Sequence, residues 1–223
     1  MLHPRDKLRS LIEQTLQSVT GIQGPGSALA LHTLGRSMPH PTDLPPLPGR
    51  RAIDRILDAF AISRLHSTLP SATSIFPPSE DLPAHLQAWS ARSTHDRRAL
   101  HRIVARQQAS GAFAIFNHDE SPDLFWFSEL VLLHAITSAG IEWDDPALLD
   151  SARRAAAFHF AETQPDHATT QPWAIHAFVL DPAHVSLSEL ILHGMFMNSP
   201  EGPGELALLL LADALHCLRK LSP

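Results

Sequence analysis

Two adjacent histidine–carboxylate pairs stand out in this sequence as groups that could carry chemistry. His118 and Asp119 form the first pair, and Asp166 and His167 form the second. Imidazole and carboxylate side chains act as acids and bases near neutral pH, and both bind zinc and similar divalent ions. These four residues are the candidate catalytic residues, and His118 and His167 are the candidate metal ligands.

The same pairs have a simpler structural explanation. Acidic residues that precede helices often accept hydrogen bonds from free backbone N–H groups and so act as helix caps. The sequence holds no HExxH motif and no other fixed spacing of metal ligands. Two interpretations therefore stay open: loop residues that cap helices, or a site that performs acid–base chemistry or holds a divalent metal.

A second set of candidates lies in or next to strongly apolar segments, where a ligand cavity could form. Aromatic stripes usually pack in a core, but aromatic walls with a few polar groups also bind small apolar ligands. Within one such segment, Glu129 and His134 are about 140° apart around a helix and cannot share one site. We expect His134 to be a structural histidine. The candidate ligand-binding residues are Trp126, Glu129, Gln171, Trp173 and His176.

The segments that carry these candidate residues are predicted to be helices. Apolar residues recur at helical spacing over residues 3–19 and 51–69, and amphipathic segments alternate with nearly all-apolar ones from residue 93 onward. No segment shows the sustained alternation of a strand. The sequence predicts an all-α fold of helical hairpins with little or no sheet, in which one helix of each pair is buried.

Prolines divide this helical chain. Residues 37–50 are proline-rich and predict an extended linker between N-terminal helices at 1–36 and a helical-hairpin domain at 51–223, all within one compact unit.

The segment RQQASGAFAIFNHDESPDLFWFSELVLLHAI, residues 106–136, resembles one repeat of the α/α toroid of terpene cyclases and protein prenyltransferases. A glutamine-rich helix end, a glycine–aromatic loop, an acidic residue and an apolar inner helix follow one another. Residues 158–178 resemble a looser second copy.

The resemblance implies a partial toroid-like array from about residue 94. If its inner helices are parallel, both histidine–acid pairs lie on one rim. The DxDD and DDxxD motifs are absent, so the resemblance implies a fold and not an activity. The matching residues are Gln107, Gln108, Gly111, Phe113 and Asp119.

Composition narrows the classes of partner. A net charge of -6, with 17 basic and 23 acidic residues, gives no electrostatic basis for binding nucleic acid. Cys217 is the single cysteine, which excludes an internal disulfide and suits the cytoplasm. The most apolar run, residues 206–211, is too short to span a membrane.

We expect a helical-repeat protein that binds a protein or a small apolar ligand through a groove or surface. The alternative is a small enzyme, with or without a divalent metal, that has a histidine–acid site on the rim of a toroid-like cavity.

Overall fold

The computed structural model describes residues 3–21, 23–36, 60, 82–113, 122–162, 172–186, 188–189 and 204–221. Within these ranges all regular structure is helical and no strand occurs, which confirms the all-α prediction. The proline-rich segment 37–50 and, apart from Phe60, the helix expected at 51–69 lie outside the described residues. No helix in the described ranges combines the length and the apolar character needed to cross a membrane.

Eight α-helices and two short 3-10 turns make up the regular structure of the described residues. The helices are α1 (Pro4–Gln17), α2 (Pro25–Thr33), α4 (Ala84–Ser93), α5 (Arg97–Val104), α6 (Pro122–Glu142), α7 (Pro146–Glu162), α9 (Ile175–Leu180) and α11 (Glu205–Leu221). The 3-10 turns are η2 (Pro172–Ala174) and η3 (Pro182–His184).

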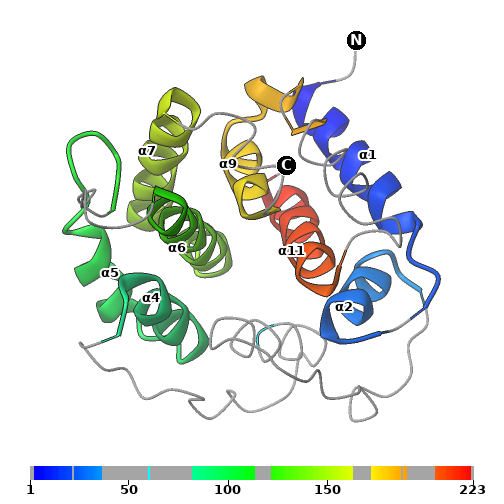
Figure 1. Cartoon of the computed structure of the whole chain (residues 1–223), viewed down its shortest axis with the longest axis horizontal. Helices are drawn as coiled ribbons and strands as arrows, with labels where there is room; N and C mark the ends of the chain where they lie inside the picture. Colours follow the sequence, from blue (N-terminus) through cyan, green and yellow to red (C-terminus); the bar gives the residue numbers. More distant parts are fainter. Residues whose placement is uncertain are drawn as a thin grey trace.

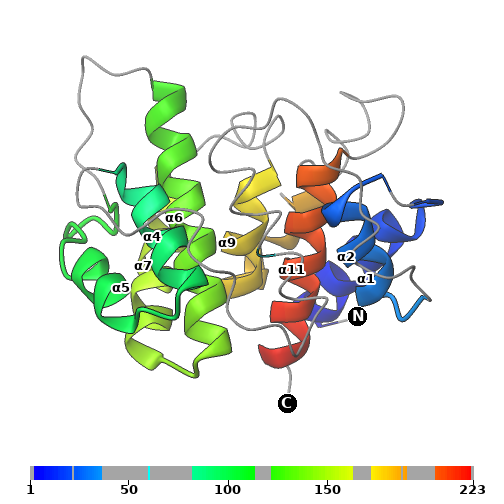
Figure 2. The ribbon, with the colours of Figure 1, turned by 90° about the horizontal axis from the view of Figure 1, so that it is seen from below.

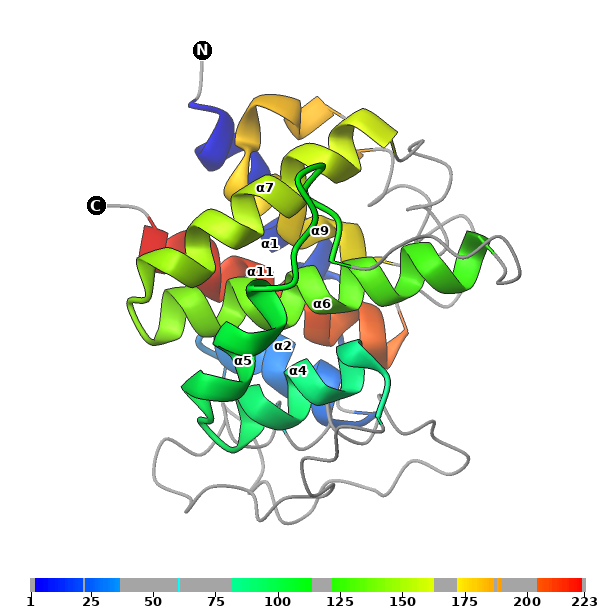
Figure 3. The ribbon, with the colours of Figure 1, turned by 90° about the vertical axis from the view of Figure 1, so that its left-hand side faces the viewer.

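The helices form an inner and an outer layer. Figure 1 shows α4, α6, α9, α11 and α2 along an inner arc, with α5, α7 and α1 outside it. The inner helices α6, α9 and α11 run in the same direction, as Figures 2 and 3 both show, whereas α7 returns antiparallel to α6. The helices α6 and α11 carry apolar side chains on nearly every face, and most of these are buried. A helix that is apolar all round is stable only when other elements cover all its faces.

Two helix boundaries differ from what the local sequence favours. A glycine often follows the last turn of a helix, but α6 continues past Gly140 to Glu142. A Cβ atom at Gly140 would lie 3.0 Å from the Leu149 side chain, so this glycine serves close packing of α6 on α7 and does not end the helix. Ser93 and Thr94 are also residue types that commonly cap helices, but Asp96 caps α5 by accepting a hydrogen bond from the Ala99 N–H at 3.0 Å.

The N-terminal helices pack on the last helix of the chain. The Glu205 carboxylate, in the first turn of α11, accepts hydrogen bonds from the backbone N–H groups of Gly26 and Ser27 at 2.8 and 3.1 Å. At the other end, the Arg219 guanidinium donates to the Thr33 carbonyl at 2.7 Å. Contacts between the two ends of the chain therefore form one side of the fold.

Gly26→Ala should destabilise the protein, although alanine is the better helix former by about 1 kcal/mol. A Cβ atom at residue 26 would lie 1.9 Å from the Glu205 carbonyl oxygen, so α2 and α11 would have to separate. We expect a loss of about 2–4 kcal/mol in the free energy of unfolding, measured by urea denaturation. Gly21→Ala is the matched control, because nothing lies within 4 Å of the added atom. Equal stability of the two variants would contradict the close contact of α2 with α11.

Candidate metal centre

Three potential metal ligands from three inner helices meet in the core. His134 comes from α6, His176 from α9 and Asp213 from α11, and one ligand atom of each lies within 4.8 Å of the others. The Asp213 Oδ2 atom lies 2.8 Å from His134 Nε2 and 3.1 Å from His176 Nε2. Among the described residues this is the one such cluster of histidine, cysteine and acidic side chains.

The apolar helices isolate this cluster from solvent. His134 and His176 are fully buried, and Asp213 is 2% exposed. The two imidazole rings stack with their centroids 3.7 Å apart. The indole of Trp89 packs edge-on against His134 at 4.8 Å, and that of Trp173 lies 5.8 Å away. The result is a small polar centre with aromatic walls.

Burial controls the protonation of His134. Loss of hydration and, to a smaller extent, the nearby His176 lower the pKa of His134 to about 3, although the hydrogen bond to Asp213 acts in the opposite direction. The His134 imidazole is therefore neutral at physiological pH. Neutral imidazole is the form that binds a metal ion.

Among the described residues, several buried polar atoms of the cluster and of the helices beside it lack a hydrogen-bond partner. They are Nδ1 of His134, Nδ1 of His176, the indole nitrogens of Trp89 and Trp173, and Oγ1 of Thr137. Buried polar groups are nearly always paired with protein or an ordered ligand, because an unpaired one costs about 1–3 kcal/mol. These buried nitrogen and oxygen atoms are thus available to donate or accept further hydrogen bonds.

Two histidines and one carboxylate form a ligand set known for zinc and for non-haem iron. Iron oxygenases with this set keep open coordination positions for oxygen and substrate. Here each ligand side chain is at most 2% exposed, so the arrangement suits a closed site better than a catalytic one.

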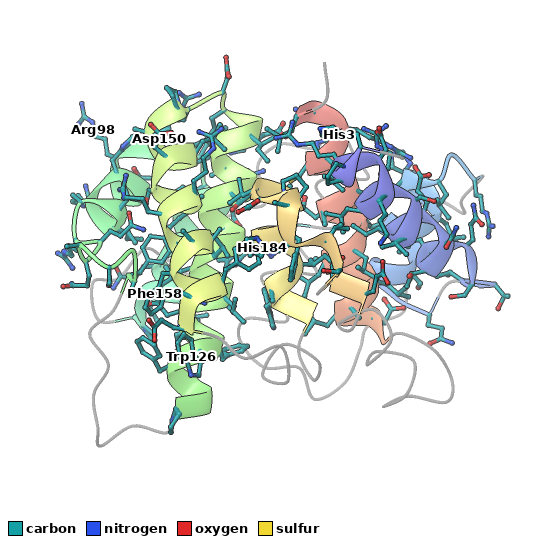
Figure 4. The ribbon with its side chains drawn as sticks, turned by 90° about the horizontal axis from the view of Figure 1, so that it is seen from above. His3, Arg98, Trp126, Asp150, Phe158 and His184 are labelled. Carbon is teal, nitrogen blue, oxygen red and sulfur yellow. The ribbon has the colours of Figure 1, made fainter. Side chains whose placement is uncertain are left out.

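The candidates from the sequence divide into three groups. His118, Asp119, Asp166, His167 and Gln171 lie outside the described residues, so the rim site stays a prediction. His176 belongs to the core cluster and Trp173 forms part of its wall. Trp126 lies elsewhere, stacked on Phe158 at 5.8 Å near one end of α6 and α7 (Figure 4).

Glu129 has a structural partner and is separate from the cluster, in agreement with its expected angle to His134. Both of its carboxylate oxygens accept the backbone N–H of Phe113, at 3.1 and 2.9 Å. The Gln107 side chain donates to the carbonyls of Gly111 and Ser151 at 2.8 and 2.9 Å. Hydrogen bonds of Gln107, Gly111 and Phe113, three residues of the toroid-like pattern, therefore attach residues 107–113 to α6 and α7.

Sequence reasoning missed Asp213 and assigned His134 to a structural role. His134 and Asp213 are 79 positions apart, and His176 and Asp213 are 37 apart, so no local motif links them. One signal was present: each is a polar residue inside an apolar helix, where an unpaired group is costly. Such residues need partners, and here they are partners of one another.

The stability of the fold should fall as the pH is lowered below 6.5. Burial lowers the pKa of His159 to about 4. The unfolded chain therefore binds a proton at this histidine near pH 6.5, whereas the folded chain binds it only near pH 4. The stabilisation is therefore complete above pH 6.5 and is lost between pH 6.5 and 4. His159→Gln should reduce the slope of unfolding free energy against pH by about 1.4 kcal/mol per unit near pH 5. An unchanged slope in urea titrations would show that His159 is not buried in its neutral form.

Comparison of the chain with known proteins gives no family assignment. No protein-family model matches the sequence, and neither a curated protein nor a solved structure is similar to it.

Proposed function

We propose that this chain is a metal-binding helical protein that holds one divalent transition-metal ion between His134, His176 and Asp213. The observation that supports it is the convergence of three ligand side chains, from three separate helices, in the buried core. A buried carboxylate is costly unless its charge is compensated. A bound cation would compensate it directly.

Zinc is the ion that this ligand set favours. Imidazole nitrogen and carboxylate oxygen are ordinary zinc ligands, and zinc imposes no geometry through its d electrons. Magnesium and calcium prefer shells made only of oxygen, so two imidazoles disfavour both. Because the site is enclosed, the proposed role of the ion is to join α6, α9 and α11 and so to stabilise the fold.

The scaffold around the metal is the second part of the proposal. We infer that the array is a partial α/α toroid-like ring, in which α6, α9 and α11 are inner helices. The parallel direction of these helices and the outer positions of α7 and α1 support this inference. The ring supplies the central axis where the three ligands face one another.

Zinc-dependent stability tests the proposal. A buried ion enters during folding, so the protein is unfolded with a chelator and refolded with zinc, with magnesium or with the chelator alone. Zinc at about 100 times its Kd should raise the free energy of unfolding by about 2.7 kcal/mol. Magnesium should have no effect. Equal stability in all three samples, with no zinc retained after desalting, would refute metal binding.

Two double variants separate the core site from the rim candidates. His134→Gln/His176→Gln removes two core ligands, and His118→Ala/His167→Ala removes the two metal ligands expected from the sequence. If the core holds the ion, only the first double variant loses the response to zinc. If only the second loses it, zinc binds at the rim and the enzyme interpretation gains support.

A shallow, open depression of the surface offers a second candidate function. It is lined on α5 mainly by basic side chains, with Asp145 beside them. Arg97 is fixed over Trp143, 5.5 Å from the ring, and His101 is paired with Asp145 at 2.9 Å. This charge suits an acidic partner, and Arg98→Glu/Arg102→Glu should abolish such binding without changing the zinc response.

A further inference from the structure

Cys217 lies one helical turn after Asp213 on α11, beside the core cluster. Its side chain is fully buried, and its Sγ atom lies 3.8 Å from Asp213 Oδ2. The thiol thus faces the oxygen that also contacts both histidines. It is the sole cysteine of the chain.

We propose that Cys217 is the fourth ligand of the metal ion, so that the site is a closed set of two histidines, one aspartate and one cysteine. This inference rests on the metal-binding function proposed above. Closed zinc sites are almost always tetrahedral with four protein ligands, whereas the cluster provides three. Residues four positions apart lie on the same face of a helix, so Asp213 and Cys217 can approach one ion together. The Cys217 Sγ atom is not within 4.8 Å of all three ligand atoms in this structure, so the proposal requires its side chain to turn toward the ion on binding.

Charge favours this assignment. A divalent ion with one aspartate and two neutral imidazoles leaves one net positive charge in a core that is closed to water. Arg92, 4% exposed on α4, is close enough to act electrostatically on His134 and adds to the positive charge. A cysteine thiolate makes the ion and its four ligands neutral. As the metal–sulfur bond forms, the thiol proton passes to the buffer.

A thiolate also determines which ions the site retains. Sulfur is a soft ligand, so its presence favours zinc and other thiophilic ions over manganese and magnesium. It also fills the position that a catalytic zinc site leaves open for water. The fourth ligand therefore predicts a structural ion with no hydrolytic activity.

Cobalt(II) substitution tests the role of Cys217, because cobalt bound to a thiolate shows an intense sulfur-to-metal charge-transfer band in the near ultraviolet. The protein is refolded with cobalt alone, and absorption and bound cobalt are measured together. We expect the band in the parent protein, with visible bands typical of tetrahedral cobalt. Cys217→Ser should lose the charge-transfer band and bind cobalt at least about tenfold more weakly.

The outcomes separate this inference from the proposed function. Cobalt bound to the parent protein without a charge-transfer band would overturn the role of Cys217 and leave the three-ligand site in place. No bound cobalt would overturn both. A band that persists in His134→Gln/His176→Gln would show that Cys217 binds the ion away from the cluster, which also contradicts the inference. Cys217→Ala, compared with Cys217→Ser without metal, reports any loss of folding.

Discussion

Asp213→Asn is expected to weaken zinc binding by about 100-fold or more, since even the outer partners of metal ligands are worth 10–100-fold in affinity. Asp213 is the centre of the cluster, because its Oδ2 atom contacts both histidines. Asparagine has nearly the same shape and keeps an oxygen that accepts hydrogen bonds, but it lacks the negative charge. Competition with a chromophoric zinc chelator after refolding measures the change in Kd.

Asp150→Asn is the matched control for this variant. Asp150 lies on α7 with its side chain 64% exposed, where it pairs with Arg153 at 2.8 Å. The same chemical change at this surface should leave the zinc affinity unchanged. Parent-like zinc affinity in Asp213→Asn, or an equal loss in both variants, would contradict the assignment of Asp213 as a ligand.

Leu130→Asp is expected to have the largest effect on folding. Leu130 is 2% exposed within α6, the longest inner helix, and the variant places an unpaired carboxylate in that core. An uncompensated buried charge costs several kcal/mol, so we expect a loss of about 4 kcal/mol or more, enough to unfold a protein of ordinary stability. Far-ultraviolet circular dichroism and urea denaturation measure it.

Ala147→Asp is the control for the introduced charge. Ala147 is exposed in the first turn of α7, where a negative charge is mildly favourable. This variant should keep the stability of the parent protein within about 0.5 kcal/mol. If Leu130→Asp melts like the control, α6 is not an inner helix and the two-layer arrangement is wrong.

The helices could be predicted from the sequence because their signals are local. Periodic apolar residues and Pro146 after Asp145 are read within a few positions, and α7 begins at that proline, with the Asp145 carboxylate accepting from Ala147 and Leu148. Helix boundaries that depend on tertiary contacts could not be predicted from the sequence. Gly140 resembles a helix end in the sequence, and only the proximity of Leu149 explains why the helix continues.

The candidate site could be predicted only in part, because it depends on which helix faces meet. His176 was a ligand-binding candidate through its position in an apolar helix beside Trp173. Asp213 was not, because an acid in the last helix gives no indication of the two histidines that contact it. Asp213 and Cys217 share a helical face in the sequence, but their common neighbours come from α6 and α9.

The position of a bound ion tests the central claim most directly. Crystals of protein refolded with zinc, measured on both sides of the zinc absorption edge, give an anomalous difference map that locates the ion independently of the surrounding model. We predict one strong peak among His134, His176 and Asp213, with Nε2 atoms about 2.0–2.1 Å from it. A map with no peak at this cluster, or with its only strong peak beside His118 and His167, would contradict the proposed core metal site.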